Sequence, residues 1–293
     1  MLPEPWRVSL HGGHSGEFCE HATGRLREVL EAAVAAGYQT FGVSEHAPRG
    51  EPRFVYDSEK EKGFTVERLQ RDFEAYAEAI RELSEQFAGR LVVLRGFEAE
   101  VVPSQGYREE MLGHHQRFGF DYMVGSVHYV DEISIDSEKA EFERATEACG
   151  GLEALAVRYY ETVAEMVAAL RPDVVGHLDL LRKNAGPNSS LDTPKIRLAA
   201  DGALEAVREH ACILDLNTAG YRKGLGTPYP APWLVKRASE MGIPFCLGDD
   251  SHGPAEVGAG IDKARQYLLE NGVATVTVVT RDEGEIVRRV VSL

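Results

Sequence analysis

Histidines recur along this chain where short apolar segments end, and this regularity constrains the fold more than any other feature. Seven of the ten histidines follow such segments: His11, His14, His21, His46, His128, His177 and His252. Side chains at strand ends can work together when the strands are parallel, because the carboxyl ends of those strands then form one rim. The pattern therefore predicts a set of parallel strands with a histidine-rich end.

The apolar segments alternate with amphipathic helical patterns along most of the chain. Continuous apolar runs, typical of parallel strands covered on both faces, occupy 7–10, 40–44, 91–97, 122–128, 174–177, 212–217, 245–248 and 274–279. Apolar residues at helical spacing occupy 26–36, 66–87, 109–118, 152–170, 194–210, 231–241 and 256–270. Seven or eight successive β/α units favour an α/β barrel over an open sheet.

Two longer connections, 48–63 and 131–151, interrupt this alternation. Both follow strands whose ends belong to the histidine-rich rim, where long loops often form lids or binding elements. We therefore expect them to shape the binding site. No repeat or flexible linker marks a second domain, so we expect a single domain over residues 1–293.

The charge balance of the chain limits its partners. It has 32 basic and 47 acidic side chains and a net charge of −15, whereas duplex nucleic acid requires a basic face. We therefore expect no nucleic-acid partner, although an anionic small molecule is compatible with divalent metals that supply local positive charge.

No apolar run reaches the roughly 18 residues of a membrane span, and the first residues lack the pattern of a secretory signal. The four cysteines are widely spaced in the chain, which argues against a disulfide framework. We therefore expect a cytoplasmic protein.

Carboxylates accompany the rim histidines. Glu98 and Glu100 follow the third apolar segment, and Asp249 and Asp250 precede the last rim histidine. Imidazole and carboxylate together are the ligand set that zinc, manganese and iron prefer, so the sequence predicts a metal centre. Cys19 also lies among these residues, and we expect it to pack rather than to bind metal.

The order of the motifs resembles the PHP superfamily, which includes polymerase and histidinol-phosphatase domains, and most closely its histidinol-phosphatase branch. The motifs are His11…His14, Glu20-His21-Ala22, Glu45-His46-Ala47-Pro48, Gly96-Phe97-Glu98, Ser126-Val127-His128, Gly176-His177-Leu178-Asp179 and Asp250-Ser251-His252. Each motif alone is weak evidence. The ordered set, which runs from about residue 7 to residue 252, is specific.

This resemblance implies a distorted (β/α)7-type, TIM-like barrel with two or three divalent metal ions, which would be zinc, iron or manganese. The implied ligands are His11, His14, His21, His46, Glu98, His128, His177, Asp250 and His252. Glu98 would bridge two ions, and Asp250 would also accept a proton from the attacking water. The implied reaction is hydrolysis of a phosphate monoester, L-histidinol phosphate, through a hydroxide that bridges two metals.

Two positions leave alternatives open. The family begins with an H-x-H pair, whereas two glycines separate His11 from His14. A glycine bulge could still point both imidazoles inward, or His11 could cap the strand instead. Glu100 lies on the same side of its strand as Glu98 and could take the bridging position.

Basic side chains beyond the strand ends are candidates for holding phosphate, since a guanidinium group matches phosphate oxygens bidentately. Arg158, Arg182, Lys183, Arg222 and Lys223 all follow the relevant strands. The segments that end in Arg182-Lys183 and Arg222-Lys223 resemble the histidinol-phosphatase branch at the places where basic side chains hold the phosphoryl group. We favour Arg222 and Arg158 over Arg182, with Asn217 as a polar contact at a strand end. Three other functions remain open: a phosphatase or phosphodiesterase for another small phosphorylated metabolite, a metal-dependent amidohydrolase, and a metal-binding domain without turnover. The Ser-x-His and Asp-x-His motifs disfavour the amidohydrolase, and the complete ligand set disfavours a domain without turnover.

Overall fold

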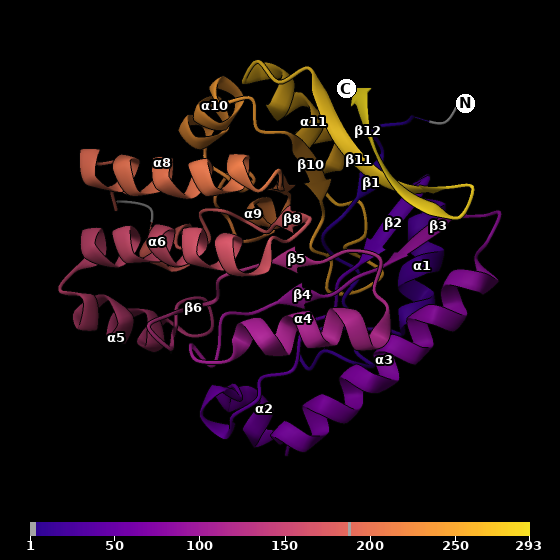
Figure 1. Cartoon of the computed structure of the whole chain (residues 1–293), viewed down its shortest axis with the longest axis horizontal. Coiled ribbons are helices and arrows are strands. Elements are labelled where there is room, and N and C mark those ends of the chain that lie inside the picture. The colour runs from indigo at the N-terminus through magenta and orange to yellow at the C-terminus, as the bar shows by residue number, and fades with distance from the viewer. Residues whose placement is uncertain (1–3, 187–188) are drawn as a thin grey trace.

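Seven parallel strands form a closed barrel in the computed structural model, which describes residues 4–186 and 189–293 (Figure 1). In barrel order they are β1 (Val8–Ser9), β2 (Thr40–Val43), the two-part β3 (Val92–Arg95) and β4 (Glu98–Ala99), β5 (Val124–Gly125), β8 (Val174–Val175), β9 (Ile213–Asn217) and β10 (Phe245–Gly248). A hydrogen bond of 2.9 Å from the Leu10 amide to the Leu247 carbonyl joins β1 to β10 and closes the ring. The distorted (β/α)7-type barrel expected from the sequence is confirmed.

Helices cover the outside of the barrel between successive strands (Figure 1). They are α1 (Leu26–Ala35), α3 (Val66–Gln86), α4 (Tyr107–Phe118), α6 (Leu152–Leu170), α8 (Pro194–Glu209), α10 (Pro232–Glu240) and α11 (Ile261–Glu270). In α1 the buried residues Leu26, Val29, Leu30 and Ala33 recur at helical spacing, so one stripe of the helix packs against the strands. No helix in the described ranges is long and apolar enough to cross a membrane.

The last helix is shorter than the sequence predicts. The expected helix spans 256–270, but α11 begins only at Ile261. Gly258 and Gly260 both have positive φ, 77° and 83°, a backbone conformation that interrupts a right-handed helix.

The C-terminal segment forms an antiparallel hairpin rather than an eighth barrel unit. The expected strand at 274–279 exists as β11 (Thr275–Asp282), but it pairs with β12 (Glu285–Ser292) through a two-residue turn. A turn this short returns the chain antiparallel, whereas a parallel partner would require a long crossover. Hydrogen bonds attach the hairpin near the amino ends of β2 and β8, at Thr40 and Asp173. It therefore lies at the end of the barrel opposite the histidine-rich rim.

Both long connections contain short elements of their own. Residues 48–63 form η1 (Pro52–Phe54) and α2 (Asp57–Glu61), whereas 131–151 contains β7 (Ile133–Ser134), paired with β6 (Tyr129–Val130), and α5 (Lys139–Cys149). Two further short helices are α7 (Arg182–Ala185) and α9 (Ala219–Arg222). Arg53 of the first connection pairs with Glu132 of the second, and the Tyr129 hydroxyl, just before the second connection, donates a 3.0 Å hydrogen bond to the Phe54 carbonyl. The two connections are therefore held together above the rim.

Candidate metal centre

Glu98 lies at the centre of a group of histidines at the carboxyl end of the barrel. Its Oε1 atom is 3.2 Å from Nε2 of His11, 3.2 Å from Nε2 of His177 and 3.5 Å from Nε2 of His128. Its Oε2 atom is 2.9 Å from Nδ1 of His46. Both oxygens of this carboxylate therefore face imidazoles, which is the arrangement required of a carboxylate that bridges two cations.

Two glycines after β1 allow both histidines of the first motif to face this group. Gly12 and Gly13 have φ of 145° and 80°, conformations that glycine adopts without a steric penalty. A side chain at Gly12 would also collide with Asp249, whose Oδ1 would lie 2.4 Å from the added Cβ. The rings of His11 and His14 are fully buried beside Glu98. The geometry thus favours the glycine bulge over the alternative in which His11 caps the strand.

A buried aspartate that the sequence analysis did not single out orients His11. Asp215 Oδ2 lies 2.7 Å from His11 Nδ1, and both side chains are fully buried. Asp215 belongs to β9 and accepts a 2.9 Å hydrogen bond from Asn217, two residues along the same strand. A charged residue inside an apolar strand is rare unless it has a partner, so this signal was available in the sequence.

Glu100 supports His128 rather than the centre of the group. Its Oε2 atom lies 2.7 Å from His128 Nδ1, and its Oε1 atom accepts a 2.7 Å hydrogen bond from the Val101 amide. This contact fixes the His128 ring with Nε2 directed at Glu98, as carboxylates do for metal-binding histidines. The geometry therefore favours Glu98 over Glu100 for the bridging position.

His46 and His252 meet at a second corner of the site, together with His14 and Cys19. One donor atom from each of these four residues lies within 4.8 Å of the others. The His21 ring stacks on His252 with centroids 4.8 Å apart, and its nitrogens lie 3.4 and 3.5 Å from Cys19 Sγ. The expected set of His21, His46 and His252 is thus brought together. Cys19, expected to do no more than pack, lies among the candidate ligands.

Asp250 has φ of 47°, in the left-handed region. Its Oδ1 atom lies 3.7 Å from His14 Nε2 and 3.6 Å from His252 Nδ1, while Asn217 donates a 3.2 Å hydrogen bond to Oδ2. Burial opposes a charge at this carboxyl, but His11 and His252 hold the pKa of Asp250 well below its usual value. The group is therefore a carboxylate that faces both corners of the site.

The donor atoms of the site fit divalent cations. Several fully buried imidazole nitrogens make no hydrogen bond, namely His11 Nε2, both nitrogens of His14, His46 Nε2 and His177 Nδ1, and such atoms are costly unless a ligand satisfies them. Burial lowers the pKa of His128, but Glu100 and Glu98 outweigh this effect and raise it to about 9. The two carboxylates thus favour positive charge beside His128, and the nitrogen and oxygen donors of the site suit zinc, manganese or iron.

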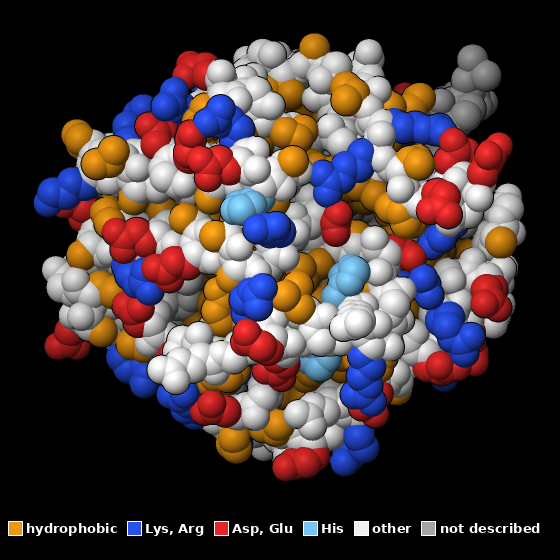
Figure 2. Space-filling view, viewed as in Figure 1, with side chains coloured by type: hydrophobic (Ala, Val, Ile, Leu, Met, Phe, Trp, Pro, Cys, Tyr) orange, Lys and Arg blue, Asp and Glu red, His pale blue; other side chains and the backbone are white. Residues whose placement is uncertain are grey.

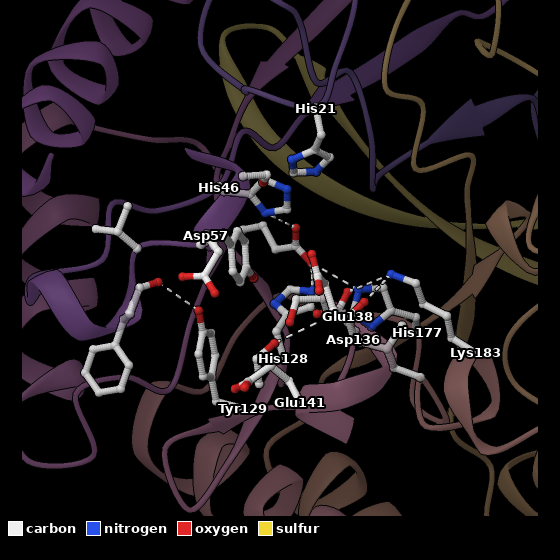
Figure 3. A pocket seen from close by; sticks show the side chains of 18 of the residues that line it. His21, His46, Asp57, His128, Tyr129, Asp136, Glu138, Glu141, His177 and Lys183 are labelled. Carbon is white, nitrogen blue, oxygen red and sulfur yellow. Dashed lines mark hydrogen bonds and ion pairs between the residues drawn. The ribbon is translucent and has the colours of Figure 1, made fainter. Parts of the chain in front are cut away.

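The site opens into a cavity of about 590 Å³, a volume typical of small-molecule sites. Figure 3 shows His46, His128 and His177 directed toward its middle, with Lys183 beside His177. Residues 53–60 and 132–144 contribute much of the wall, which confirms that the two long connections shape the site. In the space-filling view, histidine side chains are visible near the middle of the face that is drawn (Figure 2).

Two arginines expected to hold phosphate do not line the cavity. Arg158 pairs with Asp131 at 2.9 Å and with Glu165 at 2.7 Å. The Arg182 guanidinium donates a 2.9 Å hydrogen bond to the Pro228 carbonyl. Partners outside the cavity thus hold both side chains, so neither guanidinium group faces the cavity in this structure.

Asn217 and Arg222, also expected to contact substrate, support the turn that carries Asp250. Asn217 is fully buried and bonds to Asp250, as described above. Arg222 Nη2 donates 2.7 Å hydrogen bonds to the backbone carbonyls of Asp249 and Asp250. Neither side chain lines the cavity, whereas Lys183 and Lys223, the two lysines among the basic candidates, do so.

Replacement of Arg222 by methionine is expected to weaken metal binding about 10–100-fold, the usual cost of losing a group that orients a ligand. The reason is that the turn that carries Asp250 would lose two hydrogen bonds, one at the Asp249 carbonyl and one at the Asp250 carbonyl. Metal titration with a competing chelator measures the effect. Lys223→Met is the matched control, because Lys223 lines the cavity and should affect phosphate affinity but not metal affinity. Unchanged metal affinity in Arg222→Met, with weaker phosphate binding, would restore the original expectation.

Comparison with known proteins agrees with this geometry. The family model described as PHP domain matches residues 10–219. A protein of Deinococcus radiodurans named probable histidinol-phosphatase is 37% identical over 88% of this chain and 92% of its own length. A crystal structure described as a putative histidinol phosphatase from Listeria monocytogenes superposes with a TM-score of 0.77 and 26% identity, covering 87% of this chain and 99% of that one.

A second solved structure shares the fold at lower sequence identity. It is the histidinol phosphate phosphatase of Lactococcus lactis complexed with zinc, L-histidinol and phosphate, with a TM-score of 0.71, 19% identity, and coverage of 96% of this chain and 99% of that one. The match to the family model covers well over half of the chain and includes most of the residues that meet at Glu98. The chain therefore belongs to the PHP domain family.

Proposed function

We propose that this protein is a metal-dependent phosphomonoesterase whose substrate is L-histidinol phosphate. The observation that carries the proposal is the carboxylate of Glu98, surrounded by imidazoles at the base of a cavity of small-molecule size. The names of the relatives, probable histidinol-phosphatase and putative histidinol phosphatase, support the choice of substrate. The residues that would hold two or three divalent ions are His11, His14, His21, His46, Glu98, His128, His177, Asp250 and His252.

Divalent ions bound at these residues would acidify water and neutralise negative charge on the phosphoryl group. Asp250 is the candidate general base, because Oδ1 points toward His14 and His252 while Asn217 holds the other oxygen. In this role Oδ1 accepts a proton from the water that attacks phosphorus. Glu100 and Asp215 keep His128 and His11 in fixed orientations behind the reacting groups.

We assign the protein's phosphate-binding cations to Lys183 and Lys223, in place of the arginines discussed above. Both lysines line the cavity. Lys183 Nζ is anchored 3.3 Å from Asp136 Oδ2. Lys223 forms no ion pair with any residue in the described ranges, so its ammonium group can pair with a phosphate oxygen.

The outer wall of the cavity suits a substrate that carries positive charge besides its phosphate. Asp57, Glu138 and Glu141 lie along this wall (Figure 3). Asp57 pairs with Lys60, and Glu141 pairs with Arg144, whereas Glu138 has no ion-pair partner among the described residues. Histidinol phosphate carries an ammonium group and an imidazole, which carboxylates attract. A sugar phosphate has neither group.

The test is steady-state kinetics of the metal-loaded protein on a panel of hydrolysable compounds. The panel contains histidinol phosphate, a sugar phosphate, p-nitrophenyl phosphate, a phosphodiester and an amide. We expect kcat/KM for histidinol phosphate to exceed the values for the other compounds by at least about tenfold, the effect of about 1.4 kcal/mol of added transition-state binding. Preferred turnover of the diester or the amide would contradict the proposal.

We also propose that the protein acts in the cytoplasm. The support is that all four cysteines are free thiols, three of them buried, as is usual in a reducing compartment. Cell fractionation with marker enzymes tests this location, and recovery of the protein outside the cytoplasmic fraction would contradict it.

A further inference from the structure

A tyrosine hydroxyl in the wall of the cavity has no hydrogen-bond partner. Tyr229 is 1% exposed and lines the cavity, and its Oη atom is buried without a partner. A buried hydroxyl without a hydrogen-bond partner destabilises the folded protein unless a ligand or water bonds to it. We therefore expect the Tyr229 hydroxyl to form a hydrogen bond when a ligand occupies the cavity.

The surroundings of Tyr229 fix its ring firmly. Its backbone amide and carbonyl both pair with Asn217, at 2.9 and 2.8 Å. The ring packs edge-on to His177, with centroids 6.3 Å apart, and the Arg182 guanidinium lies 5.6 Å from its centre. The hydroxyl is thus held in place beside a candidate metal ligand, and little conformational entropy is lost when it binds.

The charge of the ligand follows from a comparison of Tyr229 with the other cavity residues that have buried polar atoms without hydrogen-bond partners. Among the described residues that line it, His46, Asp136, His177 and Tyr229 have buried polar atoms without partners. His46 and His177 are candidate metal ligands, and Asp136 is a carboxylate that repels anions. A phenolic hydroxyl carries its proton at neutral pH and is a hydrogen-bond donor, so the Tyr229 hydroxyl can donate to an anion.

We propose that the Tyr229 hydroxyl is a phosphate-binding group that donates a hydrogen bond to a phosphoryl oxygen of the bound substrate. This inference rests on the proposed function, because it takes the occupant of the cavity to be a phosphoryl compound. It explains Arg182 as a positioning residue, since the guanidinium covers the Tyr229 ring and does not enter the cavity. No step of proton transfer is assigned to Tyr229.

The experiment measures binding of inorganic phosphate to the metal-loaded protein by isothermal titration calorimetry. Tyr229→Phe keeps the ring and removes only the hydroxyl. We expect it to raise the dissociation constant of phosphate about 10–100-fold, the effect of losing one hydrogen bond to a charged acceptor. Metal content should equal that of the wild type. For p-nitrophenyl phosphate and an alkyl phosphate, kcat/KM should fall by the same factor.

Tyr122→Phe is the matched control, because Tyr122 is also fully buried with an unpartnered hydroxyl but packs against Gly42 and Gly96 away from the cavity. It should leave phosphate binding unchanged. Three results would overturn the inference: an unchanged phosphate dissociation constant in Tyr229→Phe, an equal loss in Tyr122→Phe, or a loss confined to the alkyl ester. If the wild type binds phosphate in a Tyr229-dependent manner but does not hydrolyse histidinol phosphate, the proposed function fails and this inference stands.

Discussion

Glu98→Gln protein is expected to lose bound metal and with it all measurable phosphatase activity. The substitution keeps the size of the side chain but removes the charge that faces His11, His128 and His46. Burial disfavours ionisation at this position, yet these imidazoles hold the pKa of Glu98 well below its usual value, so the native group is a carboxylate. Metal analysis by mass spectrometry and turnover of histidinol phosphate, measured on the same sample, provide the test.

Glu100→Gln is the control for this prediction, since both carboxylates are buried at the same strand end. Loss of a group that orients a ligand costs about 10–100-fold in metal affinity, and loss of a bridging ligand should cost more than that. Glu98→Gln should therefore be the more severe variant, and Glu100→Gln should regain metal at higher metal concentration. The reverse order would mean that Glu100 bridges the ions.

Asp250→Asn is expected to lower kcat by about 10²–10⁴-fold, the range for loss of a general base. The variant tests charge alone, because asparagine has the shape of aspartate and also tolerates the left-handed backbone at φ of 47°. Its metal content should fall less than that of Glu98→Gln. Single-turnover kinetics at saturating metal separates slow chemistry from incomplete metal loading.

Asp131→Asn provides a matched control for this substitution. Asp131 has nearly the same φ, 46°, but its side chain is exposed and pairs with Arg158. We expect Asp131→Asn to retain wild-type kcat. A fall of similar size in both variants, or wild-type kcat in Asp250→Asn at full metal loading, would remove Asp250 from the role of base.

One physical rule made it possible to predict from the sequence both the barrel and the residues that meet at its rim. Parallel strands end at the same side, so residues as distant in sequence as His14, Glu98 and His177 had to converge once the strands were recognised. The C-terminal hairpin was not predicted as such. The expected strand at 274–279 was found, but its apolar pattern does not reveal whether its partner is parallel or antiparallel.

Other features of the site depend on contacts that sequence spacing does not determine. Glu98 and Glu100 project from the same side of one strand, and only the placement of His128 between them separates their positions. The arginines were expected in the cavity because they follow rim strands, yet Arg222 turns back to the backbone of its neighbours. An arginine side chain is long enough to reach partners on either side of its loop. Its partners are therefore determined by the tertiary packing around the loop and not by sequence spacing.

The measurement that tests the central claim most directly is a metal titration of chelator-treated protein, with hydrolysis of histidinol phosphate as the readout. We predict that the metal-free protein is inactive and that activity returns in proportion to added zinc, manganese or iron until two or three ions are bound per chain. Full activity in the metal-free protein, or metal binding at Glu98 that restores no phosphatase activity, would contradict the account.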